Sequence, residues 1–217
     1  MKILDVHALP ISEVKVVRFG RYGDDRGYFT EPYRQSAVHG DPRTDFLNGL
    51  SFPQANESYS RAGVIRGLHF QWNPYMGKLV RTISGRMVDL ALDIRLESPT
   101  FGKIVAYDML STPAAGWSEW IWVPPGFAHG NYFTDETIIE YFCTGEYSPG
   151  CEAAVSPLAD DIDWSLCDPS LHDEFRGLVE GQPTISDKDR AAGSLSSWRS
   201  DPRSSNFRYS ELSTITT

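Results

Sequence analysis

The segment MVDLALDI, at residues 87–94, carries the clearest signal for the fold of this chain. Its side chains alternate in character along the segment. On a strand, one face would hold Val88, Leu90, Leu92 and Ile94, and the other would hold Met87, Asp89, Ala91 and Asp93. Two aspartates on one face are typical of a strand that lines a polar interior, as in a barrel with a site inside.

Short alternating runs continue on both sides of this segment, from residue 13 to about residue 155. Glu119–Val123 alternates in the same way, and Thr137–Cys143 is rich in β-branched and aromatic residues. Glycine and proline separate the runs at turn spacing. The pattern predicts an all-β antiparallel barrel or sandwich. Short helices are expected near Asp45–Leu50 and after Ser186.

The composition favours a globular protein with little affinity for polyanions. Of its 217 residues, 41% are hydrophobic, and 20 basic residues against 29 acidic ones give a formal charge of −9. This charge argues against a nucleic-acid or membrane surface. Three cysteines without a CxxC pair predict neither a disulfide framework nor a zinc site. Because we find no signal peptide and no stretch of membrane-spanning length, we expect a cytoplasmic protein.

The end of the sequence differs from the rest. Residues from about 192 to 217 are rich in Ser, Arg and Asp and show no hydrophobic period. Such a composition is typical of an extended arm or a loose tail. We therefore divide the chain into one domain at residues 1–190 and a C-terminal arm or tail at residues 191–217.

The segment GVIRGLHFQ, at residues 63–71, is the first candidate for chemistry. On a strand, His69 and Gln71 would share one face, while Leu68 and Phe70 would take the other. A polar group on an enclosed face needs a partner or a role, and a lone buried histidine is most often a satisfied core residue. An imidazole also titrates near neutral pH, which suits proton transfer.

With seven other segments in the same order, GVIRGLHFQ resembles the dTDP-4-dehydrorhamnose 3,5-epimerase family. These segments are GDDRGYFTEPY (23–33), PQANESYS (53–60), GKLVR (77–81), VDLALDIRLESPTFG (88–102), WVPPGFAHG (122–130), YFCTGEYSPGCE (141–152) and PTISDKD (183–189). The resemblance spans roughly residues 10–190. It implies a double-stranded β-helix, the cupin-like jelly roll, with short peripheral helices and a C-terminal extension. It also implies a homodimer that needs no metal or other cofactor.

The resemblance further implies epimerisation of a nucleotide-linked 4-keto-6-deoxyhexose at C3 and C5, of the type that converts dTDP-4-dehydro-6-deoxyglucose to dTDP-4-dehydrorhamnose. The 4-keto group acidifies the C3 and C5 protons, so inversion can proceed through an enolate. His69 matches the family's base, and Asp189 matches the carboxylate that pairs with it. Tyr141 matches the acid that returns a proton, and Lys78 matches the cation near the keto oxygen.

Each of these residues also has a purely structural interpretation. Asp189 fits the third helical position of a capping box that begins at Ser186. Tyr141 could be barrel core, and Lys78 could be a solvated lysine at a turn. Arg26 and Arg66 match positions that hold a diphosphate, which suits the planar guanidinium. The other positions that match substrate contacts are Glu31, Gln54, Asn56, His129, Tyr147, Glu152 and Lys188.

One departure and three rival interpretations remain open. Asn131 stands where members of the family usually carry a bulky aromatic or apolar residue, which puts the pocket shape or the sugar in doubt. The first rival is a metal-dependent cupin, with His69, His129 and a distant acid as ligands. The second is a non-catalytic sugar-binding module on the same fold. The third is an epimerase that acts at only one carbon of another nucleotide-linked 4-keto sugar.

Overall fold

The structure, a computed structural model, describes residues 1–212. Its strands are β1 (Ile3–Ala8), β2 (Lys15–Asp24), β3 (Gly27–Thr30), β4 (Gln54–Ser60), β5 (Val64–Gln71), β6 (Lys78–Ser84), β7 (Arg86–Asp93), β8 (Ile104–Leu110), β9 (Trp117–Val123), β10 (Phe127–Phe133), β11 (Thr137–Cys143) and β12 (Glu152–Ala154). Its helices are α1 (Gln35–Gly40), α2 (Pro169–Glu180), α3 (Asp187–Arg190), α4 (Leu195–Ser200) and α5 (Tyr209–Leu212), with 3-10 turns η1 (Pro42–Leu47) and η2 (Pro202–Asn206).

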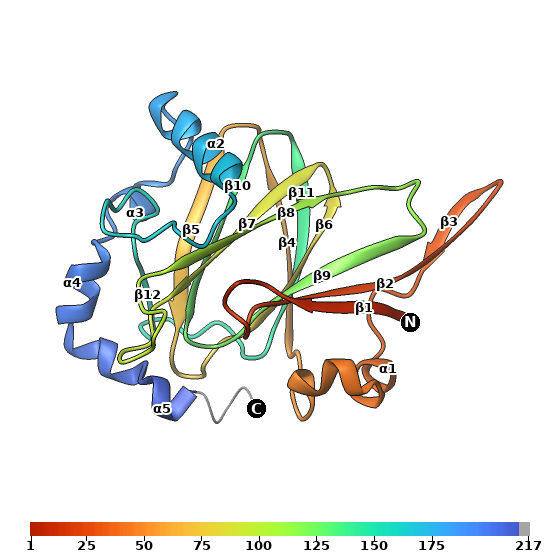
Figure 1. Cartoon of the computed structure of the whole chain (residues 1–217), viewed down its shortest axis with the longest axis horizontal. Coiled ribbons are helices and arrows are strands. Elements are labelled where there is room, and N and C mark those ends of the chain that lie inside the picture. Colours follow the sequence, from red (N-terminus) through yellow and green to blue (C-terminus); the bar gives the residue numbers. More distant parts are fainter. Residues whose placement is uncertain (213–217) are drawn as a thin grey trace.

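The strands form two antiparallel sheets that face each other (Figure 1). The seven-stranded sheet runs in the order β1-β2-β9-β6-β11-β4, with β3 paired to β2. The five-stranded sheet runs in the order β12-β5-β10-β7-β8. This arrangement confirms the predicted all-β fold, a cupin-like jelly roll with short peripheral helices. The two predicted short helices are also present, as η1 and α3.

The alternation along β7 divides its side chains between two cores, as predicted. Met87 and Ala91 point between the sheets and pack with apolar residues from both, including Val80 and Ile121. On the opposite face, the leucines and valine of β7 pack beneath the C-terminal helices. Asp89 shares the inner face with Met87 and Ala91 and is only 1% exposed. A buried carboxylate in this position must find hydrogen-bond donors between the sheets.

The C-terminal segment covers the outer face of the five-stranded sheet (Figure 1). The ring of Trp198 packs against Phe70 of β5 with centroids 4.6 Å apart, and Phe207 contacts the same ring at 5.3 Å. The prediction of an extended arm or loose tail at residues 191–217 is therefore wrong for residues 191–212, which form a packed layer. Its few apolar anchors are too widely spaced to produce a hydrophobic period. Residues 213–217 of the predicted tail lie outside the described residues.

Two further helical regions complete the outer layers. Helix α2 was not among the helices predicted from the sequence, although its apolar residues recur at helical spacing and pack against the core; these are Leu171, Phe175, Leu178 and Val179. Helix α1 and η1 pack near the N-terminal strands on the other sheet, where Val38 and Leu47 join Trp120 in a third core cluster. Within residues 1–212, no helix combines the length and the apolar character needed to span a membrane.

We predict that Trp198→Ala lowers the free energy of unfolding by about 3–5 kcal/mol, because it removes a large buried ring from the contact between α4 and β5. Urea unfolding of the two proteins measures this loss. Ser196→Ala, at an exposed position of the same helix, is the matched control and should change stability by less than about 0.5 kcal/mol. A loss below about 1 kcal/mol for Trp198→Ala would show that this layer does not stabilise the barrel.

Candidate active site

An open cavity of about 520 Å³ lies between the two sheets. An adjoining cavity of about 350 Å³ shares His69, Lys78 and Tyr141 with it, so the two are parts of one cleft. Strands β5 and β10 of the five-stranded sheet form one wall, and β4, β6 and β11 of the other sheet form the opposite wall. The segment at residues 184–189 closes one side.

The first polar pair in the cleft joins β5 to α3. His69 Nε2 and Asp189 Oδ1 are 2.6 Å apart, and the Gly67 amide donates to Asp189 Oδ2 at 3.2 Å. A carboxylate only accepts, so Nε2 carries the proton of the neutral imidazole and Nδ1 is the basic nitrogen. Burial favours a higher pKa for the Asp189 carboxyl, but the hydrogen bonds from His69 and Gly67 lower it below its ordinary value. The pair is therefore an imidazole base oriented by an ionised carboxylate.

Both sequence interpretations of Asp189 describe part of the structure. Its backbone N–H donates to the Ser186 hydroxyl, which caps α3. Its carboxylate binds His69 and the Gly67 amide. The short helix thus aims the carboxylate at the histidine.

Close backbone approach brings β5 and β10 together beside this pair. Gly67 has φ of +111°, and a Cβ there would lie 2.6 Å from the Gly130 Cα atom. Any larger residue at position 67 would be strained and would push the strands apart. Gly67 is also the residue whose amide binds Asp189, so the close approach helps fix the carboxylate.

A second histidine–carboxylate pair lies on the same wall. His129 Nε2 donates to Asp89 Oδ2 at 2.7 Å, and His129 Nδ1 accepts from Lys78 Nζ at 3.4 Å. Burial lowers the pKa of His129, so the ring stays neutral and can accept from the ammonium. Asp89 was expected on a polar face of its strand but was not among the candidate site residues. Its inward position in the alternation was the signal that could have found it.

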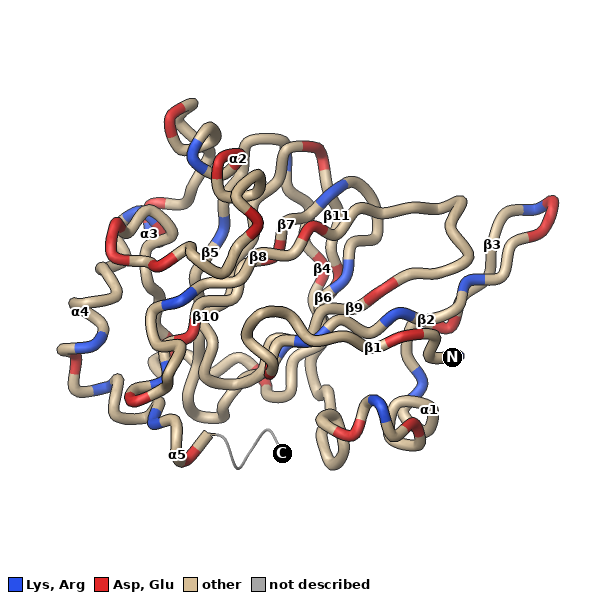
Figure 2. Tube along the Cα trace, in the orientation of Figure 1, with Lys and Arg blue, Asp and Glu red and all other residues tan. Residues whose placement is uncertain are grey.

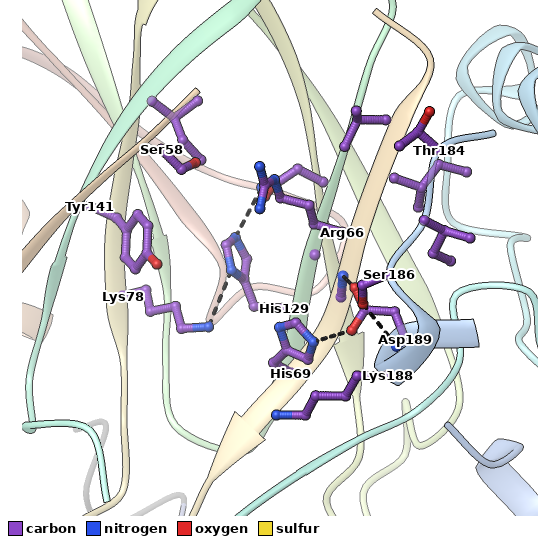
Figure 3. A pocket seen from close by; sticks show the side chains of 17 residues that line it. Ser58, Arg66, His69, Lys78, His129, Tyr141, Thr184, Ser186, Lys188 and Asp189 are labelled. Atoms are coloured by element: carbon purple, nitrogen blue, oxygen red, sulfur yellow. Dashed lines mark hydrogen bonds and ion pairs between the residues drawn. The ribbon is translucent and has the colours of Figure 1, made fainter. Parts of the chain in front are cut away.

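The opposite wall supplies Tyr141 from β11 and Lys78 from β6 (Figure 3). Burial raises the pKa of the Tyr141 phenol above its ordinary value, so it is protonated at neutral pH and can donate. Burial lowers the pKa of the Lys78 ammonium, while Cys143 and Asp89 act in the other direction. Because Tyr141 and His69 belong to facing sheets, a ligand between them presents one face to each.

The mouth of the cleft gathers most of the other candidate contacts. Gln54 Nε2 donates to Asn56 Oδ1 at 3.1 Å, and Gln54 Oε1 accepts from the Tyr147 amide at 2.8 Å. Glu152 Oε1 accepts from the Tyr147 hydroxyl at 2.8 Å and from Lys188 Nζ at 2.9 Å. These residues lie in or beside the smaller part of the cleft.

Arg66 lies at the edge of the larger part of the cleft. Its guanidinium donates to the Ser60 hydroxyl at 2.9 Å and to the Tyr59 carbonyl at 3.0 Å. Basic and acidic residues are otherwise interspersed along the described chain rather than gathered on one element (Figure 2). Positive charge near the cleft is therefore local, in Arg66, Lys78 and Lys188.

Two candidates lie outside the cleft of this chain. Arg26 sits at the tip of the β2–β3 hairpin, where its side chain is 90% exposed and pairs with Asp24 at 2.6 Å. Glu31 follows the hairpin and binds the N-terminal amine of Met1. The hairpin projects away from the two sheets (Figure 1). The structure of one chain therefore does not bring Arg26 or Glu31 to the other site residues.

The spacing of the histidines bears on the metal-dependent rival. His69 and His129 are paired across β5 and β10, but each Nε2 binds a different carboxylate. Within residues 1–212, no group of three or more His, Cys, Asp or Glu side chains is placed to hold a metal ion. This arrangement does not fit the two-histidine, one-carboxylate site of that rival.

Comparison with known proteins agrees with this geometry. The family model for dTDP-4-dehydrorhamnose 3,5-epimerase matches residues 8–197. The chain belongs to this family. The dTDP-4-dehydrorhamnose 3,5-epimerase of Sinorhizobium fredii is 41% identical over 145 residues, which cover 65% of this chain and 69% of that protein.

Two solved structures have the same fold. The dTDP-6-deoxy-D-glucose-3,5-epimerase of Legionella pneumophila, in complex with dTDP-4-keto-L-rhamnose, has a TM-score of 0.73 and 33% identity, with 88% of this chain and 93% of that one covered. The rmlC epimerase of Mycobacterium tuberculosis has a TM-score of 0.78 and 29% identity, with 98% of each chain covered. The family assignment made from the sequence is confirmed.

We predict that the alkaline limb of the kcat/KM profile reports Lys78. Its lowered pKa means that it loses its proton below the ordinary lysine value of about 10.4, whereas Tyr141 keeps its proton longer than an ordinary tyrosine. Activity should fall as pH rises through the lowered pKa, because neutral Lys78 no longer stabilises negative charge. In Lys78→Arg the residual activity should lose this limb, since guanidinium stays charged. A limb at the same pH in both proteins would contradict the assignment.

Proposed function

We propose that this protein inverts C3 and C5 of a dTDP-linked 4-keto-6-deoxyhexose by removing and returning a proton at each carbon. The observation that carries this proposal is the placement of the base and the acid on facing sheets. His69 belongs to the five-stranded sheet and Tyr141 to the seven-stranded sheet, and both line one cleft. Inversion requires a proton to leave one face of the sugar and return on the other, which this geometry allows.

In the proposed reaction, His69 Nδ1 takes the proton from the carbon beside the keto group. The electrons of the C–H bond form the enolate, whose charge collects on the C4 oxygen. Lys78 stabilises this oxygen, and His129 holds the ammonium in place through Nδ1. Tyr141 then gives its proton to the carbon from the opposite face. The imidazolium and the tyrosinate exchange protons with solvent, which restores both groups.

Asp89 has a positioning role in this scheme. Its hydrogen bond to His129 Nε2 fixes the tautomer in which Nδ1 is an acceptor. A histidine in the other tautomer would present an N–H to Lys78 and repel the ammonium. The two carboxylates of the cleft therefore act alike, since Asp189 and Asp89 each orient one imidazole.

The nucleotide part of the substrate is proposed to lie toward the mouth of the cleft. The Legionella relative was solved with a dTDP-linked keto sugar, and a diphosphate needs cationic or N–H donors. Arg66 supplies a guanidinium there, already oriented by Ser60 and Tyr59. Gln54, Asn56, Tyr147, Glu152 and Lys188 are proposed to contact the same ligand.

A homodimer is part of the proposal. The projecting β2–β3 hairpin exposes Tyr28 and Phe29, which are 50% and 66% accessible, and large apolar side chains on a projecting element favour a protein contact. A second copy would bring its own hairpin to another chain. Arg26 and Glu31 would then reach a substrate that they cannot reach within one chain.

Two expectations from the sequence stay proposals. We infer a reducing, cytoplasmic location, which agrees with three unpaired cysteines in the described chain. We also propose inversion of both carbons rather than one. A 3'-monoepimerase of Streptomyces bikiniensis has the same fold at 23% identity, so fold alone does not separate the two outcomes.

We predict that variants of the base and of the acid fail in different ways in heavy water. His69→Asn should lose both deuterium exchange and inversion by about 10²–10⁴-fold, because no proton is removed. Tyr141→Phe should still exchange, since His69 can return a deuteron to the face it came from, but should lose inversion to a similar extent. NMR of the sugar measures both quantities. Inversion by Tyr141→Phe at the wild-type rate would remove Tyr141 from the mechanism.

We predict a solution mass of twice the 24.3 kDa of one chain. Light scattering coupled to size exclusion at micromolar concentration measures it. Phe29→Asp should weaken the dimer, because it places a charge on the exposed apolar face of the hairpin, whereas Asp25→Ser at the nearby tip should not. A wild-type mass equal to one chain would contradict the proposed homodimer.

A further inference from the structure

Asn131 is a buried amide in the wall of the cleft. It lies on β10, two residues beyond His129, and is 4% exposed. Its Nδ2 donates to Asp89 Oδ2 at 3.1 Å and contacts Met87 Sδ at 3.3 Å and His129 Nε2 at 3.5 Å. The amide nitrogen therefore faces Asp89, whose carboxylate oxygen accepts its hydrogen bond. The chemistry of Asp89 thus determines which way the amide points.

Because Nδ2 faces Asp89, the side-chain oxygen of Asn131, Oδ1, points away from that carboxylate. Within residues 1–212 it has no hydrogen-bond partner. The enclosed side-chain atoms without a partner are Arg21 Nε, His39 Nε2, Asp89 Oδ1 and Trp198 Nε1, and Asn131 Oδ1 is not among them. Since Asn131 lines the larger part of the cleft, we infer that its oxygen faces that space. Asn131 Oδ1 is thus a hydrogen-bond acceptor that the wall of the cleft holds in one orientation.

We propose that Asn131 is a specificity-determining residue whose Oδ1 accepts a hydrogen bond from a ring hydroxyl of the bound sugar. This inference rests on the proposed function for the class of ligand, a nucleotide-linked 4-keto sugar. Of the groups on such a ring, hydroxyls donate, whereas the keto oxygen only accepts and the C6 methyl does neither.

A hydrogen bond to Asn131 Oδ1 would favour sugars that carry a hydroxyl at this position over sugars that lack it. A ligand that places a hydroxyl at Asn131 satisfies the amide, while a deoxy sugar covers Oδ1 with a C–H group and leaves it unpaired. An unpaired polar group in a desolvated site costs more than a hydrogen bond contributes in water. The site should therefore prefer the hydroxylated ring by about tenfold or more over the matching deoxy ring.

Asn131 is held firmly enough to act in this way. Its donor side is bound to a carboxylate that is itself fixed by His129, so the amide cannot rotate to present Nδ2 without breaking the contact with Asp89. This anchoring makes the acceptor preorganised and reduces the entropy lost on binding.

Calorimetric binding in the His69→Asn background, which lacks the proposed base, tests the inference without turnover. The ligands are dTDP-4-keto-6-deoxyglucose and its 2-deoxy and 3-deoxy counterparts. In that background the wild-type residue Asn131 is compared with Asn131→Leu, which keeps the approximate volume and removes the acceptor. We expect the protein with the wild-type residue 131 to bind the parent sugar about tenfold more tightly than one of the two deoxy sugars. We expect Asn131→Leu to bind that pair equally.

Binding of dTDP alone is the control, because it lacks the sugar and should bind both proteins alike if the variant is folded. If dTDP affinity falls in Asn131→Leu, Asn131→Ala, which is smaller, cannot distort the wall by its bulk and also lacks an acceptor, replaces it in the same comparison. Equal discrimination by the wild type and the variant, for both deoxy sugars, would overturn the inference. Absence of epimerisation by the wild type would refute the proposed function instead, and the binding ratios would still decide the role of Asn131.

Discussion

The hydrogen bond between His69 and Asp189 is the contact on which the rest of the site depends. It joins a strand in the middle of one sheet to a short helix 120 residues later in the chain. To form it, the segment before α3 must run along the edge of the cleft, and Gly67 must allow β5 to approach β10 closely. Once it forms, one nitrogen of the imidazole is committed to the carboxylate and the other is available as a base. The position of the His69 imidazole, its tautomer and its enclosure in the cleft thus follow from a single contact.

The need to partner buried polar groups explains the second pair, between His129 and Asp89. Polar groups between two sheets must be partnered, and the inner faces together with the adjoining helix α3 bring two histidines, two aspartates and a lysine to the cleft. Each histidine binds its own carboxylate, so neither imidazole is left to pair with the other or with a shared ligand. Lys78 then binds the second ring nitrogen of His129 from the facing sheet. Pairing needed for folding therefore also leaves an imidazole base on one wall and a lysine and a phenol on the other.

The sequence predicted the parts of the fold that are encoded by local alternation. Both faces of residues 87–94 and of residues 68–71 were assigned correctly, because a period of two fixes them whatever the strands pair with. The C-terminal layer was missed because Trp198 and Phe207 act as isolated anchors, held by tertiary packing rather than by a pattern of their own. Helix α2 was missed although Leu171, Phe175, Leu178 and Val179 recur at helical spacing, so its signal was present in the sequence.

For the site, the family resemblance supplied residues, and the structure supplied their arrangement. That His69 and Tyr141 face each other follows from the strand order of two sheets, which local sequence does not contain. Asp89 was visible as an inward aspartate, but its partner His129 lies on another strand, so its role was hidden. Arg26 and Glu31 matched by motif, yet they lie on or beside a hairpin that leaves the body of the chain. Contact with a substrate in the cleft would require the second chain of the proposed homodimer.

Deuterium incorporation by the wild-type protein is the most direct test of the account. The protein is incubated with dTDP-4-keto-6-deoxyglucose in heavy water, and the label at C3 and C5 of the sugar is followed by NMR. Deuterium should enter both carbons, and the configuration at both should be inverted. Deuterium at C3 alone would make the protein a single-site epimerase, and no deuterium at either carbon would contradict the assignment of His69 as the base.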